Sequence, residues 1–182
     1  MIDIRRAMAI DGYMAEAELL WLAERATECR VIVEVGSYKG RSTRALADHC
    51  PGVVYAIDPW DGGYKNDDGT QARWLDTKGA RMRFDENLVD HVVSGKVIVH
   101  QGVLADVQVE ALRADLLFID GDHRYLAVRD DITLGQKIVR SGGILCGHDY
   151  GHKTWPGVKR AVHEMFGRAV NIQPPSIWWV RL

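Results

Sequence analysis

The sequence has no apolar run that approaches the ~20 residues that a membrane-spanning helix requires. Asp3, Arg5 and Arg6 near its start are followed by no sustained apolar stretch of the kind found in signal peptides. These two absences lead us to expect a protein that is neither exported nor embedded in a membrane.

A marked excess of charge is also missing, because 23 lysines and arginines face 25 aspartates and glutamates, for a net charge of −2. General binders of nucleic acids or anionic membranes usually carry a basic excess or stripe. The three cysteines form neither a C-x-x-C pair nor an even-numbered set, which favours a reduced, cytoplasmic setting. The composition therefore favours a cytoplasmic protein with a small-molecule partner, and it disfavours nucleic acid and membrane as partners.

What the sequence does contain is a regular alternation of strand-like and helix-like segments. With 182 residues and 47% hydrophobic content, the chain can bury one α/β core, so residues 1–182 are predicted to form a single domain. The alternation predicts a doubly wound, mostly parallel sheet with a ligand site at the carboxyl ends of its strands. A helix is expected within residues 15–28. Strands are expected at 31–33, 53–57, 96–100, 115–119 and 143–146, with a closing hairpin around Pro174-Pro175 in residues 169–182.

The most informative segment is a glycine turn after the first strand, within residues 31–43. A dinucleotide fingerprint, G-x-G-x-x-G, needs a glycine where this segment has Tyr38, so NAD is disfavoured. Ser42 or Thr43 is predicted to cap the following helix. Glu34 could balance a cationic ligand and Gly36 could admit a bulky one, and S-adenosylmethionine has both features.

Five residues of this turn, Glu34, Gly36, Tyr38, Gly40 and Ser42, fit the pattern E-x-G-x-Y-x-G-x-S. With it the sequence resembles the class I S-adenosylmethionine-dependent methyltransferases, and among them the small O-methyltransferases of the catechol O-methyltransferase type and their bacterial relatives. The resemblance implies a Rossmann-like methyltransferase fold, with a seven-stranded sheet that ends in an antiparallel hairpin. It also implies transfer of a methyl group to an oxygen.

The rest of the cofactor site is expected along the next strand ends. Asp58 ends the second strand about twenty residues after the turn, where an acidic side chain can accept hydrogen bonds from both ribose hydroxyls. The resemblance places Gly102 and Val103 beside the adenine ring. The cofactor-binding residues are thus predicted to be Glu34, Gly36, Ser37, Tyr38, Gly40, Ser42, Asp58, Gly102, Val103 and Asp120.

A metal site is predicted from the ends of the last two parallel strands. Asp120 follows one strand, and His148 with Asp149 follows the other, so the three side chains would meet at one edge of the sheet as a partial shell for a divalent cation. In the resembled enzymes these positions bind magnesium. His148 stands where they carry Asp or Asn, so manganese, iron and zinc are alternatives. The competing interpretation is structural, with Asp120 capping a helix and His148 held by an ordinary hydrogen bond.

The predicted chemistry uses such a cation because a neutral hydroxyl is a poor nucleophile, and coordination lowers its pKa. His123 stands where the catechol-type enzymes carry a lysine base, and an imidazole with a pKa near ~6.5 can accept a proton near neutrality. Asp120 and His123 are therefore the expected catalytic residues. The expected acceptor is a hydroxyl of a small molecule or of a sugar-containing metabolite.

Residues 59–72 are rich in glycine and carry aromatic side chains, and we expect them to cover the active site. Together with the N-terminal segment, residues 1–14, they would select the acceptor. Three alternatives stay open: an ordinary surface loop at 59–72, a metal-independent methyltransferase, and a non-catalytic module that binds the cofactor. A homo-oligomer is also compatible with the sequence, with Trp178 and Trp179 as core or interface residues.

Overall fold

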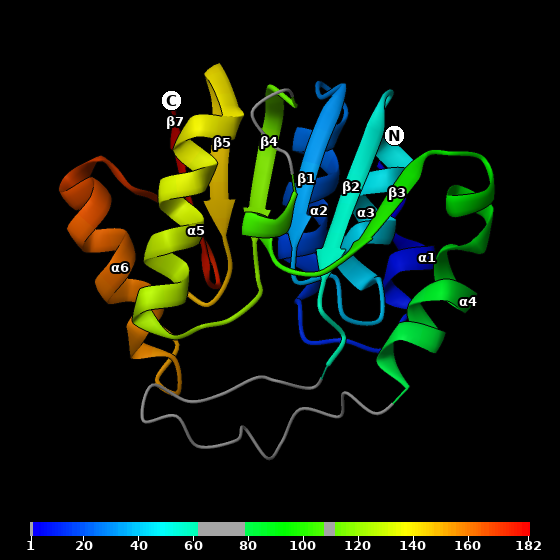
Figure 1. Ribbon diagram of the computed structural model, residues 1–182, viewed down its shortest axis with the longest axis horizontal. Helices are drawn as coiled ribbons and strands as arrows, with labels where there is room; N and C mark the ends of the chain where they lie inside the picture. Colours follow the sequence, from blue (N-terminus) through cyan, green and yellow to red (C-terminus); the bar gives the residue numbers. More distant parts are fainter. Residues whose placement is uncertain (1, 62–78, 108–111) are drawn as a thin grey trace.

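The computed structural model describes residues 2–61, 79–107 and 112–182. Within these residues a seven-stranded sheet runs in the order β3-β2-β1-β4-β5-β7-β6 (Figure 1). Strands β1 to β5 pair in parallel, whereas β7 pairs antiparallel with both β5 and β6. The strands are β1 Val31–Val35, β2 Val53–Asp58, β3 Val97–Gln101, β4 Ala114–Ile119, β5 Val139–Gly147, β6 Asn171–Gln173 and β7 Ile177–Arg181.

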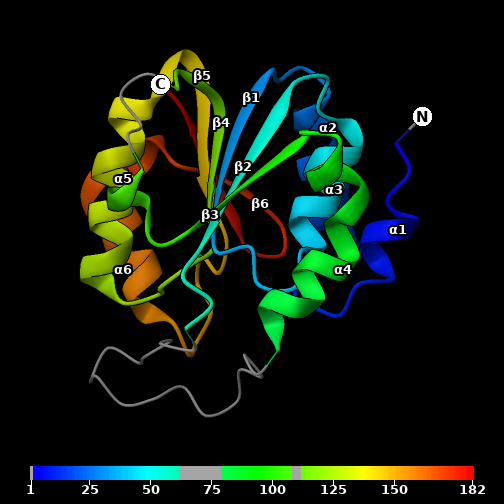
Figure 2. The same cartoon turned by 45° about the vertical axis from the view of Figure 1, so that its right-hand side comes forward.

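Helices cover both faces of the sheet, as Figure 2 shows most clearly, with α1 to α4 on one side and α5 and α6 on the other. Neighbouring residues of a strand point to opposite faces, so Ile32 packs into the core under α2 and α3, and Val33 into the core under α5 and α6. The helices are α1 Arg5–Met8, α2 Glu16–Ala26, α3 Arg41–His49, α4 Ala80–Val93, α5 Tyr125–Ile138 and α6 Pro156–Phe166.

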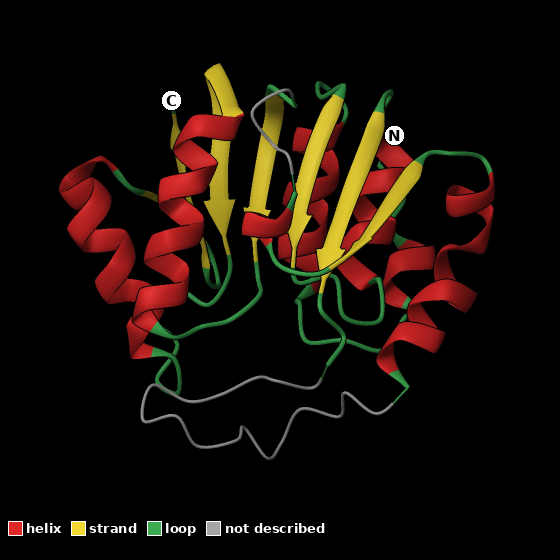
Figure 3. Ribbon diagram, in the orientation of Figure 1, coloured by secondary structure: helices red, strands yellow, loops and turns green. Residues whose placement is uncertain are grey.

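This architecture confirms the predicted doubly wound sheet, with helices in front of it and behind it in Figure 3, and the antiparallel pairing of β6 with β7 confirms the closing hairpin. The two tryptophans of β7 lie on opposite faces: Trp178 is buried beside Phe166, and Trp179 packs against Trp21. Strand β5 begins four residues earlier than residue 143, where the sequence predicted it. The glycine pair at 142 and 143 interrupts the apolar pattern and hides that extension from the sequence.

The predicted hydroxyl cap of α3 is wrong. Gly40, in the left-handed conformation with φ of 90°, is the N-cap residue, and no side chain caps the helix. The Thr43 hydroxyl hydrogen-bonds instead to Glu34, a buried carboxyl group beneath the turn.

Two further expectations concern membrane spanning and the cover loop. No helix among the described residues is long and apolar enough to cross a membrane. Most of the predicted cover loop, residues 62–72, lies outside the described residues.

Candidate active site

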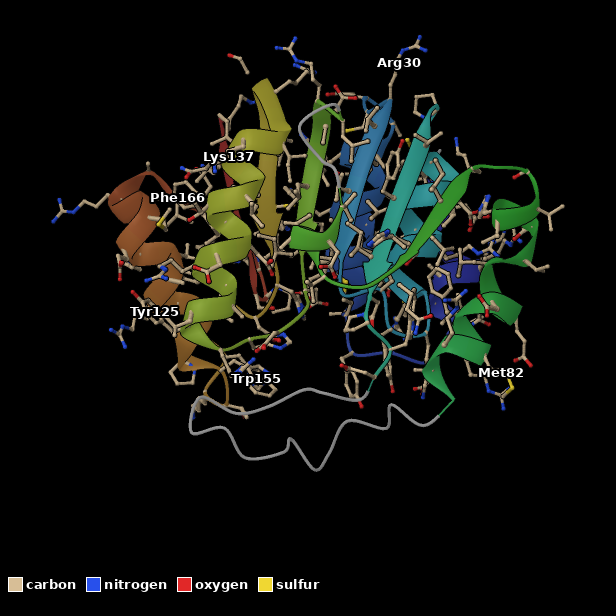
Figure 4. The ribbon with its side chains drawn as sticks, in the orientation of Figure 1. Arg30, Met82, Tyr125, Lys137, Trp155 and Phe166 are labelled. Atoms are coloured by element: carbon tan, nitrogen blue, oxygen red, sulfur yellow. The ribbon has the colours of Figure 1, made fainter. Side chains whose placement is uncertain are left out.

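A cavity of about 710 Å³ lies at the carboxyl edge of the sheet, and the turn after β1 forms one wall of it. Figure 4 shows Trp155, a lining residue, at this edge, whereas Arg30 lies at the opposite edge. The lining combines three groups: Gly12, Tyr13, Met14, Ala15 and Glu18 near the N-terminus; Gly36, Ser37, Tyr38, Arg41 and Ser42 from the glycine turn; and Asp120, His123, residues 148–155, Pro175 and Ser176 beyond β4, β5 and β6.

The glycine turn packs directly against the turn that follows β4. Gly36 has a φ of 89°, and a Cβ atom at this position would lie 2.2 Å from the backbone oxygen of Asp120. Only glycine fits, because the left-handed conformation and the close approach both exclude a side chain. Gly36 thus fixes the distance between the expected cofactor turn and the acidic strand end.

Glu34 supports the turn from below and is fully buried. Its Oε2 atom accepts hydrogen bonds from the hydroxyls of Ser37, at 2.7 Å, and Thr43, while Oε1 is buried without a hydrogen-bond partner. Burial raises the pKa of Glu34 to about 7, although hydrogen bonds from the neighbouring hydroxyls act in the opposite direction. Since Glu34 is not among the residues that line the cavity, its contacts support a structural role in the turn.

Asp58 links the glycine turn to the ends of β2 and β3. Its carboxylate accepts hydrogen bonds from the backbone N–H groups of Tyr38, at 2.8 Å, and Trp60, at 2.7 Å. Its backbone oxygen accepts one from Gly102 at 3.1 Å. The structure therefore brings Asp58, Gly102 and the turn together, while the exposed Val103 follows Gly102. These residues lie beside the described cavity without lining it, so the cavity contains the turn and the acidic edge rather than the expected adenosine end.

The acidic edge itself gathers two carboxylates and two imidazoles. The Nε2 atom of His123 lies 2.9 Å from Oδ2 of Asp149 and 3.4 Å from Oδ1 of Asp120. The Nδ1 atom of His148 lies 3.4 Å from the same Asp120 oxygen and 3.5 Å from Oδ1 of Asp149. The structure thus brings together all four residues that the sequence singled out here.

Charge pairing and burial shift the pKa values of this cluster in opposite directions. Burial alone would lower the pKa of His123, but the carboxylates of Asp120 and Asp149 raise it to about 9. The same carboxylates, with Glu18, hold the pKa of His148 well above its usual range in spite of burial. Burial would raise the pKa of Asp149, but its two histidine partners hold it below its usual range.

The His123 ring is held in place by stacking. It lies 4.7 Å from the Trp155 ring, centroid to centroid, with an angle of 17° between the two planes. Its Nε2 atom is buried and makes no aligned hydrogen bond, even though a carboxylate oxygen is only 2.9 Å away. A metal ion bound to Nε2 would give this buried nitrogen a partner, because a ligating imidazole uses the lone pair of an unprotonated nitrogen.

The donor set fits a divalent cation. Ligand atoms of Asp120, His123 and Asp149 all lie within 4.8 Å of one another. In an octahedral shell with bonds of about 2.1 Å, neighbouring ligand atoms are about 3 Å apart, which is close to the separations seen between His123 and the carboxylates. The mixture of imidazole and carboxylate suits manganese, iron or zinc as well as magnesium.

Sequence reasoning missed Glu18, although it lines the cavity and contacts His148. Glu18, Leu22 and Ala26 follow one another at four-residue spacing and are all buried. A single carboxylate on an otherwise apolar helix face is therefore the signal that could have identified it. Trp155 and Ser176 carried no comparable signal.

Comparison with known proteins agrees with this geometry. Residues 33–150, more than half of the chain, match a family described as methyltransferase domain. The chain therefore belongs to this methyltransferase family. The predicted resemblance to class I methyltransferases is confirmed in family and in fold.

Solved structures with the same fold are distant in sequence. A putative O-methyltransferase from Klebsiella pneumoniae has a TM-score of 0.64 and 20% identity over 98% of this chain and 86% of that one. The O-methyltransferase from Bacillus cereus, in complex with S-adenosylhomocysteine, has a TM-score of 0.67 and 16% identity, covering 97% and 86% of the two chains. The apo structure of the TDP-rhamnose 3'-O-methyltransferase CalS11, from calicheamicin biosynthesis, has a TM-score of 0.67 and 16% identity, covering 90% and 76%.

A relative with higher identity matches a shorter segment. An uncharacterized protein, R132, of Acanthamoeba polyphaga mimivirus is 44% identical over 52 residues, which are 28% of this chain. The match spans about a quarter of that relative's length, 24%.

Proposed function

We propose that the protein transfers a methyl group from S-adenosylmethionine to a hydroxyl oxygen of a small molecule, with a divalent cation at Asp120 and Asp149. The cluster of two carboxylates and two imidazoles at the cavity edge is the observation that carries this proposal. Family membership supports methyl transfer, and the turn around Gly36 supports a cofactor whose methionine end faces the cluster.

The cation would be held by Asp120 and Asp149, with His123 and His148 completing the protein ligands. When bound, it would lower the pKa of the acceptor hydroxyl and hold the oxygen in place. The methyl group would then pass from the sulfonium to that oxygen, with the thioether as leaving group and the hydroxyl proton released to solvent. In this proposal His123 is a ligand rather than the expected base, because its Nε2 atom is buried and faces both carboxylates.

A phosphate-bearing acceptor, such as a sugar nucleotide, is the substrate class that the surroundings support best. A second cavity, of about 470 Å³, shares Gly151, His152 and Lys153 with the first. Its lining includes Lys153, Lys159 and Arg160 and no acidic residue. Within the described part of the chain, these three cations form no ion pair, and the Arg160 guanidinium lies 4.0 Å from the centroid of the Tyr125 ring. A neighbour of the same fold is a TDP-rhamnose 3'-O-methyltransferase, which agrees with an acceptor of this class.

Calorimetry with S-adenosylmethionine and S-adenosylhomocysteine tests the cofactor. Saturable binding of both is expected, and a folded sample that binds neither would contradict the proposal. Activity on a panel of phenols, sugars and sugar nucleotides, before and after chelation, tests the reaction. Methyl transfer that survives complete chelation would instead indicate a metal-independent enzyme, and cofactor binding without transfer would indicate a binding module.

A further inference from the structure

Glu18 is a buried carboxylate whose place in the fold is set by its partners. It lies on α2 and only 1% of its surface is exposed. A carboxylate buried to this degree is costly unless hydrogen bonds or opposite charges compensate it. Three separate segments of the chain supply that compensation.

All hydrogen-bond partners of Glu18 are donors. Its Oε1 atom accepts hydrogen bonds from the backbone N–H of Ser176, at 3.1 Å, and from the Ser176 hydroxyl, at 2.8 Å. Its Oε2 atom accepts one from the backbone N–H of Ala15, at 2.9 Å, and lies 3.0 Å from Nε2 of His148. Because a carboxylate only accepts hydrogen bonds, Nε2 of His148 must carry a hydrogen here.

This contact determines which atom His148 presents to the acidic edge. With Nε2 facing Glu18, the opposite ring nitrogen, Nδ1, lies 3.4 Å from Asp120 and 3.5 Å from Asp149. In metal sites, a ligating histidine commonly donates its other N–H to a carboxylate, which fixes the ring and strengthens the ligand. The geometry of Glu18, His148 and the two aspartates has this form.

We propose that Glu18 is a positioning residue that orients His148 so that its Nδ1 atom binds the cation at Asp120 and Asp149. This inference rests on the proposed metal site and adds a residue outside the methyltransferase motifs. It differs from a purely structural role, in which Glu18 only ties α2 to the segment around Ser176. The difference lies in the coordination of the cation, which a structural role would leave unchanged.

The test uses Mn²⁺ as the probe and the full chain as the protein. Electron paramagnetic resonance gives the Mn²⁺ affinity, and electron spin echo modulation detects imidazole nitrogen bound to the metal. His148→Ala identifies the His148 signal. Glu18→Ala removes the carboxylate, and Glu18→Gln keeps its size, in case the alanine variant does not fold. Glu16→Gln, an exposed residue in the first turn of the same helix, is the matched control.

We expect Glu18→Ala to lose the His148 nitrogen coupling and to bind Mn²⁺ about 10- to 100-fold more weakly. Glu18→Gln should weaken binding by a smaller factor, because its amide oxygen can still accept from His148 while its NH2 group opposes the donors on the other side. Glu16→Gln should match the wild type in affinity and in the echo signal.

Three results would overturn the inference. If both Glu18 variants keep the wild-type affinity and coupling, Glu18 does not position His148. If affinity falls while the His148 coupling persists in the bound fraction, the role is structural. If the wild type binds no Mn²⁺ at all, the proposed metal site fails, and this inference fails with it. The first two outcomes leave the metal site standing, so the two failures are distinguishable.

Discussion

Asp115 and Asp120 stand at the two ends of strand β4, and their side chains are similarly exposed, at 15% and 19%. Asp115 accepts hydrogen bonds from the backbone N–H groups of Arg30, at 2.6 Å, and Val31, at 2.9 Å, and from Nε of Arg140, at 2.6 Å. Asp120 instead faces two imidazoles at 3.4 Å, beside a second carboxylate. Burial does not explain this difference, because it is nearly the same at both ends.

The carboxylates at the two ends of β4 therefore have different roles, one in stabilising the fold and one in binding a ligand. At the amino end each oxygen of Asp115 has a short, well-placed donor, which is the pattern of a residue that stabilises the fold. At the carboxyl end four titratable groups form a cluster, with the imidazoles 2.9 to 3.5 Å from the carboxylates, and Nε2 of His123 has no aligned hydrogen-bond partner. Such a cluster is expected where a ligand completes the site.

The largest expected effect comes from the carboxyl end. Asp120→Asn should lower turnover on the order of 10²–10³-fold, because it removes charge that stabilises the cation and the transition state. The affinity for S-adenosylhomocysteine should stay within a few-fold. Steady-state kinetics and calorimetry measure the two quantities, and undiminished turnover would show that Asp120 does not serve the reaction.

Glu34 provides a pH-dependent test of the turn beneath the site. Its pKa of about 7 in the folded state lies above the 4.5 of an exposed glutamate, so the folded state keeps a proton that the unfolded state loses. The contribution of Glu34 to stability should therefore fall as the pH rises from about 4.5 to about 7, by on the order of 3 kcal/mol, and change little above that.

Urea unfolding of the wild type and of Glu34→Gln, at pH 5 and at pH 8, measures this effect. The amide does not titrate, so the wild type should lose stability relative to Glu34→Gln between pH 5 and pH 8. A difference that is equal at both pH values would mean that Glu34 keeps an ordinary pKa.

Asp115→Ala tests the amino end with the opposite expectation. Two backbone donors and the Arg140 side chain lose their acceptor, so the free energy of unfolding should fall by about 1–3 kcal/mol. Turnover at a temperature where the variant is folded should stay within about twofold. A large loss of activity without a loss of stability would remove the contrast between the two ends of β4.

The smallest effect is expected at the cationic cavity. Replacing Lys159 or Arg160 with alanine should weaken the binding of inorganic pyrophosphate about two- to fivefold for each exposed cation removed. Lys137→Ala is the control, since Lys137 lies on α5 and its side chain is exposed away from the cavity (Figure 4). Equal losses in all three variants, measured by calorimetry at low salt, would indicate attraction by general charge rather than a site.

The sequence predicted the scaffold well because the scaffold depends on local patterns. Val31 to Val33, followed by Gly36, predict a buried strand and a turn from neighbouring residues alone. The same reasoning placed Asp120, His148 and Asp149 together, because parallel strands end at a common edge.

The contacts that decide individual roles are not local, and the sequence could not supply them. His148 meets Glu18 across 130 positions, and Ser176 meets it across 158. The contacts of Glu34, beneath the glycine turn, were also not predicted from the sequence. Ser42 and Thr43 were predicted to cap the helix, but Gly40 is the N-cap residue, and the Thr43 hydroxyl donates to the buried carboxyl group of Glu34. His123 contacts Trp155, 32 positions away, and Asp149, 26 positions away, and nothing in the sequence indicated either contact.

The most direct test of the account is anomalous diffraction from crystals soaked in Mn²⁺, recorded above and below the manganese absorption edge. The account predicts a peak within bonding distance of Asp120, Asp149 and at least one of the two imidazoles, and no peak at Asp115. Soaked crystals that show no peak at the carboxyl edge, or an equal peak at both ends of β4, would contradict it.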